Sequence, residues 1–153
     1  MNPPTTELLQ KNKEIPFDLL LLADESISAI QKYIRQSDIY VYRHDGKIIG
    51  AYVMLAVDDH TIEIKNIAVD QSFQGQGIGR KLLGDAIDRA KEKGFKRIII
   101  GTGNAAIKQL YLYQKVGFEI YDIKRGFFLN NYPEPIFENG IQLKHMVMLE
   151  MGL

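Results

Sequence analysis

The sequence contains no cysteine, and its charged side chains cancel to a formal net charge of zero. The absence of cysteine excludes disulfide bonds, thiolate metal sites and a cysteine nucleophile. It also agrees with a reducing compartment such as the cytoplasm. Because 19 basic side chains balance 19 acidic ones, no strong overall field attracts nucleic acid. We therefore expect a cytoplasmic location and no nucleic-acid partner.

Long apolar runs are also missing, and the run at 19–23 is long enough for a buried strand at most. The N-terminal residues 1–7 lack the basic region and apolar core of a signal peptide. No set of histidine, aspartate and glutamate residues shows the spacing of metal ligands. From these absences we expect no membrane partner and no metal.

What the chain does contain is the composition of an ordinary globular protein. Its 153 residues are 46% apolar and 25% charged, and no internal repeat or low-complexity tract divides them. A chain of this length can bury a sizeable core without disulfides or metals. We expect a single domain over residues 1–153.

The first half of the chain shows the pattern of antiparallel strands. Asp45-Gly46 between two apolar stretches indicates a tight hairpin, because Asp-Gly supplies the positive φ that the turn needs. Ile27, Ile30 and Ile34 share one face of a helix. The expected elements are strands at 17–22, 38–43, 48–57 and 62–69 and a helix at 26–35.

The second half alternates helices and strands. Apolar residues at 78, 82, 83, 86, 87 and 90 predict a helix that ends before Gly94. Three successive isoleucines predict a strand at 97–101, and Asn104 can cap a helix that ends near Val116. Strands at 118–124 and 146–151 flank a long loop at 126–142. The strand–helix–strand segment 62–101 predicts a right-handed parallel crossover in a mixed α/β fold.

A glycine-rich segment, Gln74-Gly75-Gln76-Gly77-Ile78-Gly79-Arg80, opens the helix after the strand at 62–69. The first N–H groups of a helix are unpaired and carry partial positive charge, so they bind phosphate groups. Glycines allow the backbone to approach phosphate oxygens closely. Arg80 and Lys81 add positive charge. The residues alone therefore predict an anion site, with a ligand-free glycine turn as the alternative interpretation.

Three phosphate-binding loops can be compared with this segment. A P-loop requires lysine followed by serine or threonine after its last glycine, whereas Gly79 is followed by Arg80. The dinucleotide fingerprint requires glycines spaced by one and then two residues, and Arg80 occupies the place of its third glycine. The pattern Gln/Arg-x-x-Gly-x-Gly/Ala is matched at every position by Gln74, Gly77 and Gly79.

Two segments in this order resemble motifs of the GNAT acetyltransferases. The first is Ile64-Lys65-Asn66-Ile67-Ala68-Val69 with the glycine-rich segment after it. The second is Leu112-Tyr113-Gln114-Lys115-Val116-Gly117-Phe118, which is similar to Tyr-x-Lys/Arg-x-Gly-Phe. The resemblance covers about residues 62–122, although the proline usual after the first motif strand is absent. It implies an α/β fold with a mixed, centrally splayed β-sheet flanked by helices, and acetyl-CoA as co-substrate.

Matched position by position, the resemblance implies where coenzyme A binds. The backbone at 74–80 would hold the pyrophosphate, and the strand edge at 67–69 would pair with the pantetheine amides as an added strand does. A β-bulge there would splay this strand from the one starting at Arg97 and open a cleft for the thioester. The implied cofactor-binding residues are Ile67, Ala68, Val69, Gln74, Gly75, Gln76, Gly77, Ile78, Gly79, Arg80 and Asn104.

Tyr113 and Glu63 are the expected catalytic residues. By the resemblance, Tyr113 would lie near the thioester sulfur and protonate the departing thiolate, and packing in the core is its alternative role. Glu63 stands where some family members carry a catalytic glutamate, and it would take a proton from the attacking amine. An ion pair with Lys65 is the alternative role of Glu63, and a chain of waters is the alternative base. A backbone N–H near Val69 would stabilise the oxyanion.

The acceptor is expected at the loop 126–142, because loops of this length are often lids or binding loops. Tyr132 can cover an apolar substrate body, and Glu134 and Glu138 can attract an ammonium group. A packed surface loop is the alternative. We expect direct acetyl transfer in a ternary complex to a primary amine of a small molecule or peptide. An acyl-CoA sensor without turnover and a peptide N-terminal acetyltransferase are the alternatives, and the family suggests a homodimer.

Overall fold

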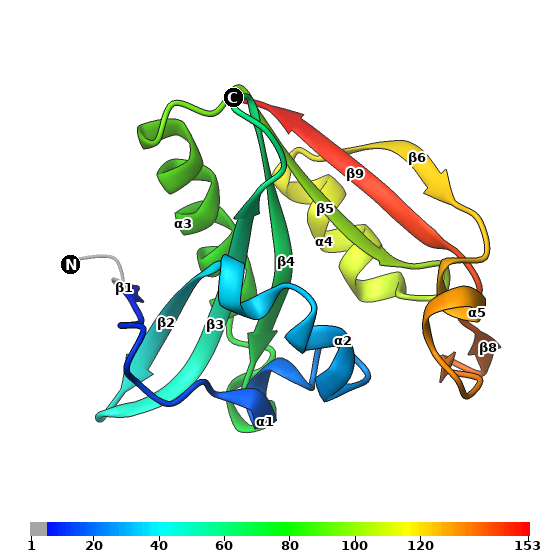
Figure 1. Ribbon diagram of the computed structural model, residues 1–153, viewed down its shortest axis with the longest axis horizontal. Coiled ribbons are helices and arrows are strands. Elements are labelled where there is room, and N and C mark those ends of the chain that lie inside the picture. The colour runs from blue at the N-terminus through cyan, green and yellow to red at the C-terminus, as the bar shows by residue number, and fades with distance from the viewer. Residues whose placement is uncertain (1–5) are drawn as a thin grey trace.

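The computed structural model describes residues 6–153, and its centre is a seven-stranded β-sheet (Figure 1). The segment 1–7, predicted not to be a signal peptide, lies largely outside the described residues. The strands, in their order across the sheet, are β1 (Glu7–Leu8), β2 (Asp38–His44), β3 (Lys47–Ala56), β4 (Thr61–Val69), β5 (Arg97–Gly103), β9 (Met146–Gly152) and β6 (Glu119–Lys124). The helices are α1 (Phe17–Leu20), α2 (Ile27–Gln31), α3 (Ile78–Glu92), α4 (Ile107–Val116) and α5 (Phe127–Asn131). Two 3-10 turns, η1 (Ile34–Gln36) and η2 (Gln71–Phe73), and a separate hairpin of β7 (Phe137–Glu138) and β8 (Ile141–Gln142) complete the described elements.

The sheet is mixed, because β4 and β5 run parallel while the other neighbouring strands of the sheet run antiparallel. The helix α3 connects the two parallel strands, as the strand–helix–strand pattern predicted. The Asp45-Gly46 hairpin is confirmed by φ angles of 50° and 79°. The last strand, β9, lies between β5 and β6. The predicted mixed α/β class is therefore confirmed.

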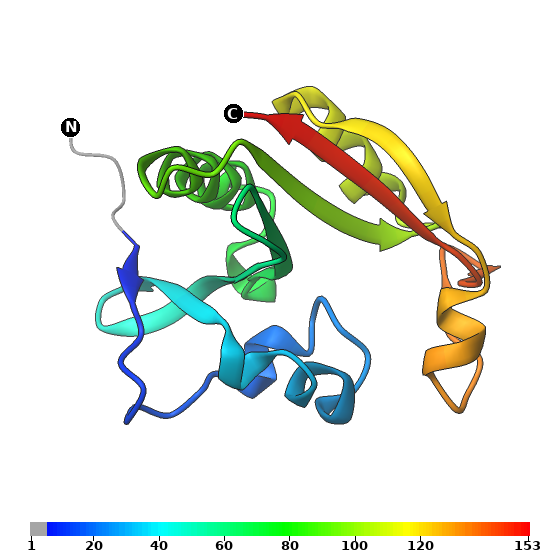
Figure 2. The ribbon, with the colours of Figure 1, turned by 45° about the horizontal axis from the view of Figure 1, so that its top comes forward.

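Helices cover both faces of the sheet around β3 and β4 (Figure 2). On one face, Leu20 of α1 and Ile30 of α2 are buried together with Val53 of β3. On the other face, α3 buries each of its predicted apolar positions, and Gly94 follows the helix with a φ of 88°. Each fully buried leucine or isoleucine contributes about 1.5–3 kcal/mol. These two layers fix β4, the strand that carries the first motif, in the interior of the molecule.

The strands β4 and β5 separate halfway along β4. They pair from Thr61 with Arg97 to Ile64 with Ile100, and 65–69 have no strand partner on this side among residues 6–153. On the other side, β3 pairs with Asn66 and then with Ile64, so Lys65 is an extra residue, a β-bulge. A bulge bends its strand and increases the local twist. The predicted central splay is confirmed, and Figure 1 shows the two strands diverging.

Two predicted elements differ from the structure. The segment 17–22 contains the helix α1 and is not a strand. A short apolar run fits a strand or a buried helix equally well, and Pro16 stands directly before the first helical residue, where its fixed φ suits a helix start. The loop 126–142 is not irregular, because it contains α5 and the β7–β8 hairpin.

The sequence predicted that Asn104 caps α4, but the structure shows that it does not. That helix begins at Ile107, and no described side chain caps it. The Asn104 Oδ1 atom instead accepts hydrogen bonds from the backbone N–H groups of Lys144 and His145, at 2.7 and 3.0 Å. The backbone turns between Asn104 and the helix, so its side chain lies beside the segment before β9.

Candidate active site

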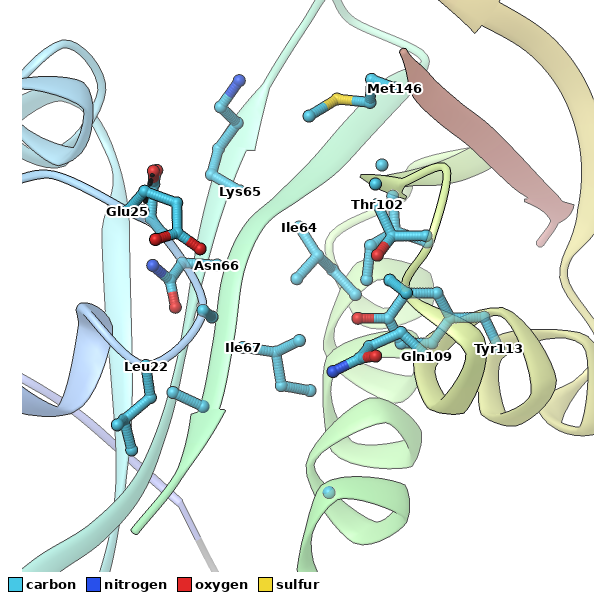
Figure 3. A pocket seen from close by; sticks show the side chains of 18 of the residues that line it. Leu22, Glu25, Ile64, Lys65, Asn66, Ile67, Thr102, Gln109, Tyr113 and Met146 are labelled. Atoms are coloured by element: carbon cyan, nitrogen blue, oxygen red, sulfur yellow. Dashed lines mark hydrogen bonds between the residues drawn. The ribbon is translucent and has the colours of Figure 1, made fainter. Parts of the chain in front are cut away.

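A cavity of about 810 Å³ opens where β4 and β5 separate. Its walls come from these two strands, the start of α3, the helix α4 and the segments around α2 and α5. Figure 3 shows Ile64 and Ile67 of β4 on one side and Thr102 and Tyr113 on the other. The volume lies in the range of small-molecule and cofactor sites. One cavity thus joins the glycine-rich segment to residues from both halves of the chain.

The glycine-rich segment enters α3 through left-handed backbone. Gly75 and Gly77 have φ angles of 80° and 81°, a conformation that costs other residues about 1–2 kcal/mol. A Cβ at either position would meet no described atom within 4 Å, so the backbone conformation, not crowding inside the chain, requires glycine. Gly77 is the N-cap residue of α3, and no side chain of residues 6–153 caps this helix start. The first N–H groups of α3 are therefore available to an anion.

The edge of β4 released from β5 forms the adjoining wall. Ile67, Ala68 and Val69 line the cavity, and the Val69 carbonyl accepts a hydrogen bond from Gln74 Nε2 at 3.0 Å. This bond ties the glycine-rich segment to the end of β4. An extended ligand can pair with such a strand edge as an added strand would. Of the glycine-rich segment, the cavity lining includes Gln74, Gly75, Gly77, Ile78, Gly79 and Arg80, while Gln76 is exposed outside it.

Tyr113 lies on α4 and faces the cavity (Figure 3). It is 5% exposed, and its ring packs against Phe118 with 6.3 Å between ring centroids. Burial raises the pKa of Tyr113, and the negative charge of Glu138 raises it further. The hydroxyl therefore stays protonated at neutral pH and can donate a proton. Tyr111, two residues earlier, is 66% exposed and points elsewhere, as the helix geometry predicted.

Glu63 lies on the paired part of β4 and also lines the cavity. Its Oε1 atom is 3.5 Å from the Nζ atom of Lys65, so the ion pair named as its alternative role is present. Lys65 Nζ also lies 5.4 Å from the ring centroid of Tyr33. Glu63 thus faces the cavity as a paired carboxylate.

The end of the cavity away from the glycine-rich segment is called the acceptor end. Carboxylates from both halves of the chain line it. Asp24 and Glu25 precede α2, Glu138 lies on β7, and all three line the cavity together with Tyr132. The Tyr132 hydroxyl donates a hydrogen bond to Asp24 Oδ1 at 2.6 Å and joins the two sides of the cavity. Burial raises the pKa of Glu25, and the charges of Glu138 and Asp24 raise it further. These carboxylates therefore lie close enough to repel one another.

Asn66 lies on β4 beside these carboxylates and is 4% exposed. Its Nδ2 atom donates hydrogen bonds to the Leu20 carbonyl at 3.0 Å and to the Tyr33 hydroxyl at 3.1 Å. The Tyr33 hydroxyl donates in turn to Asp24 Oδ2 at 3.2 Å. The Asn66 Oδ1 atom has no partner in the described part of the chain, although buried polar atoms are nearly always hydrogen-bonded. The cavity wall thus holds an unused acceptor.

Besides Gln76, two other predicted site residues do not line the cavity. Glu134 is exposed, and Asn104 uses its side chain to hold the segment before β9. The composition of a loop does not tell which of its side chains point inward, so Glu134 could not be separated from Glu138. Among residues 6–153, no three His, Asp or Glu side chains are grouped closely enough to hold a metal. No helix within that range combines the length and apolarity that a membrane crossing requires.

Four residues of the acceptor end were not predicted from the sequence: Asp24, Glu25, Tyr33 and Asn66. Asp24 and Glu25 precede Ser26, whose Oγ atom accepts a hydrogen bond from Ala29 N–H at 3.1 Å, so they resemble residues before any helix. The one available signal was Asn66, a polar residue on the inward side of the motif strand. Its role depends on side chains distant in sequence.

The comparison with known sequences agrees with this geometry. Residues 6–118 match the Acetyltransferase (GNAT) family. The chain is 46% identical over 147 residues to the uncharacterised N-acetyltransferase YvbK of Bacillus subtilis, with 96% of this chain and 95% of that protein covered.

Solved structures with the same fold include proteins of high sequence identity. A GNAT family acetyltransferase from Elizabethkingia anophelis, solved with acetyl-CoA bound, is 50% identical with a TM-score of 0.95 and 97% of both chains covered. A Bacillus subtilis acetyltransferase in complex with CoA is 45% identical with a TM-score of 0.90 over 97% of both chains. An IAA acetyltransferase from Bacillus cereus is 44% identical, with a TM-score of 0.93 over 97% of this chain and 99% of that chain. The chain therefore belongs to the GNAT family of acetyltransferases.

Proposed function

We propose that this protein transfers an acetyl group from acetyl-CoA to a primary amine of a small molecule or peptide, by direct attack in a ternary complex. The observation that carries the proposal is the single cavity in contact with the start of α3, the released edge of β4 and Tyr113. Acetyl-CoA in the Elizabethkingia anophelis relative and CoA in the Bacillus subtilis relative support it.

Acetyl-CoA fits the features of this cavity in two places. The N–H groups at the start of α3, behind the left-handed turns at Gly75 and Gly77, would hold the pyrophosphate. The edge of β4 at 67–69 would pair with the amides of the pantetheine arm. Arg80 lines the same region and adds positive charge. Together these groups would position the thioester between β4 and α4.

The chemical step needs one proton removed and one supplied. The amine nitrogen attacks the thioester carbonyl carbon, and the carbon–sulfur bond then breaks. Tyr113 would donate its proton to the departing thiolate, because it lines the cavity and its hydroxyl is protonated at neutral pH. Glu63 would take the proton from the amine, directly or through water, since it lines the cavity. A backbone N–H near Val69 would stabilise the oxyanion.

The geometry of the acceptor end favours a small molecule over a peptide. The hydrogen bond between Tyr132 and Asp24 spans the cavity there, so a chain-like acceptor would have to pass around or break it. For this reason we propose a small molecule as the acceptor and keep a peptide N-terminus as the alternative.

The test is release of free thiol from acetyl-CoA with a panel of amines: diamines and polyamines, aminoglycosides, amino acids and N-terminal peptides. We expect turnover with at least one small amine, identified by mass spectrometry as its acetylated product. Tight binding of acetyl-CoA without acetylation of any amine would favour the sensor and contradict the proposal.

A further inference from the structure

The acceptor end carries more negative charge than the described chain neutralises. Asp24, Glu25 and Glu138 come from both sides of the cavity, and none has a cationic group of residues 6–153 within 4.0 Å. Glu63, by contrast, is paired with Lys65. Two exposed lysines, Lys32 and Lys124, line the cavity as well, yet neither approaches a carboxylate that closely.

Glu138 connects the carboxylates to the reaction centre. Its charge raises the pKa of Glu25 across the cavity and that of Tyr113 on α4. Glu138, Glu25 and Tyr113 also line the same cavity. A cation bound beside Glu138 therefore lies within reach of an acceptor whose amine attacks near Tyr113.

Asn66 provides an independent sign that a ligand binds here. Its Oδ1 atom is buried in the cavity wall without a described partner, while its Nδ2 atom is fixed by Leu20 and Tyr33. The two Nδ2 bonds set the orientation of the amide, so Oδ1 cannot be exchanged for the donor nitrogen. Figure 3 shows Asn66 and Glu25 on the same side of β4. A donor N–H group from a ligand would satisfy this atom.

The reacting nitrogen can be the cation beside these carboxylates only until it loses its proton. An amine attacks as the free base, so it contributes no positive charge in the reacting complex. Like charges in a partly buried cavity cost free energy unless a counter-charge compensates them. A second charged group on the acceptor would keep this compensation after the reacting nitrogen has lost its proton.

Building on the proposed acetyl transfer, we infer that the acceptor is a small aliphatic diamine whose second, protonated nitrogen binds between Glu25 and Glu138 with Asn66 Oδ1 as an additional acceptor. Part of the cavity wall is apolar, since Leu22, Phe127 and Met146 line the same cavity. Methylene groups pack on such walls without losing hydrogen bonds. Lys32 and Lys124, which are exposed and also line the cavity, disfavour acceptors with additional positive charges beyond these two.

The first experiment compares kcat/KM for 1,4-diaminobutane and n-pentylamine, which have the same number of heavy atoms and differ in the second ammonium group. We expect the diamine to be favoured at least tenfold. The double variant Glu25→Gln, Glu138→Gln should reduce that preference to about one, because both charges that select the cation are gone. Glu92→Gln, an exposed change at the end of α3, is the matched control and should keep the preference.

Loss of folding would not mimic this result. The folded-state pKa of Glu25 is raised, so its ionised form destabilises the folded protein above that pKa and has no effect below the unfolded pKa. At neutral pH, Glu25→Gln should therefore melt no lower than the wild-type protein. A melting curve for each variant checks this.

Binding separates this inference from the proposed function. Calorimetry of 1,4-diaminobutane with the CoA-loaded protein should show the same preference over n-pentylamine without turnover. If the diamine binds but no amine is acetylated, the proposed function fails and the diamine site stands. If n-pentylamine reacts and binds as well as the diamine, or the preference survives the double variant, acetyl transfer stands and the diamine inference is overturned.

Discussion

The two ends of the cavity are built in different ways. The end at the glycine-rich segment uses backbone groups from one continuous stretch, the end of β4 and the start of α3. The acceptor end uses side chains from β4, from β7 and from the segments next to α2 and α5, which are joined by hydrogen bonds such as that between Tyr132 and Asp24. A backbone site persists as long as its turn can form, whereas a side-chain site changes with each substitution. The first end is therefore suited to a constant co-substrate and the second to a particular acceptor.

The largest expected effect is at the backbone end. Gly77→Glu should lower acetyl-CoA affinity at least 100-fold, about 2.8 kcal/mol, because the new side chain occupies the pyrophosphate region and repels its charge. Gly46→Glu, in the β2–β3 turn with a φ of 79°, places the same residue in similarly strained backbone outside the cavity. It should bind acetyl-CoA normally. Calorimetry on both variants decides, and wild-type affinity in Gly77→Glu would place the cofactor elsewhere.

The second largest effect is expected at Tyr113, which lies between the two ends of the cavity. Tyr113→Phe should lower kcat about tenfold or more, because the ring still packs against Phe118 but the proton donor is lost. The dissociation constant for acetyl-CoA should stay the same. Tyr111→Phe removes an exposed hydroxyl from the same helix and serves as the control. An unchanged kcat in Tyr113→Phe would assign the residue to packing alone.

A smaller change is expected at Glu63. Glu63→Gln should reduce turnover mainly at lower pH, where more of the amine is protonated and its proton limits the rate. We expect less than about a tenfold loss, since water can accept the proton in its place. A full pH profile of kcat against that of Glu92→Gln measures this effect. Superimposable profiles would favour the water chain as the base.

The smallest effect sharpens the description of the acceptor end. Tyr132→Phe removes the hydrogen bond to Asp24, which is worth about 1 kcal/mol, and should raise the acceptor KM roughly fivefold. The KM for acetyl-CoA should not change, because the glycine-rich segment is not involved. Steady-state kinetics with both substrates varied gives both constants, with Tyr111→Phe as the reference. A parallel change in both, or in neither, would make the 126–142 segment structural.

Much of the fold followed from local patterns. The apolar spacing of α3 requires one buried face, and Asp45-Gly46 requires a hairpin, so both were predicted correctly. The prediction of a strand at 17–22 was wrong because a four-residue helix has too few turns to show a helical period. The prediction that Asn104 caps α4 was wrong because the position of a cap depends on where the helix begins, and the residue type alone does not determine that.

The sequence by itself determined the glycine-rich turn, the motif strand and the position of Tyr113 on its helix, because each depends on residues adjacent in the chain. Only the tertiary structure decided that the bulge at Lys65 releases β4 from β5 and that the segments at 24–25, 66, 132 and 138 meet in one cavity. The hydrogen bond between Tyr132 and Asp24 alone joins residues 108 positions apart. These contacts form because apolar packing on both faces of the sheet fixes the helices and loops, and no local pattern encodes that arrangement.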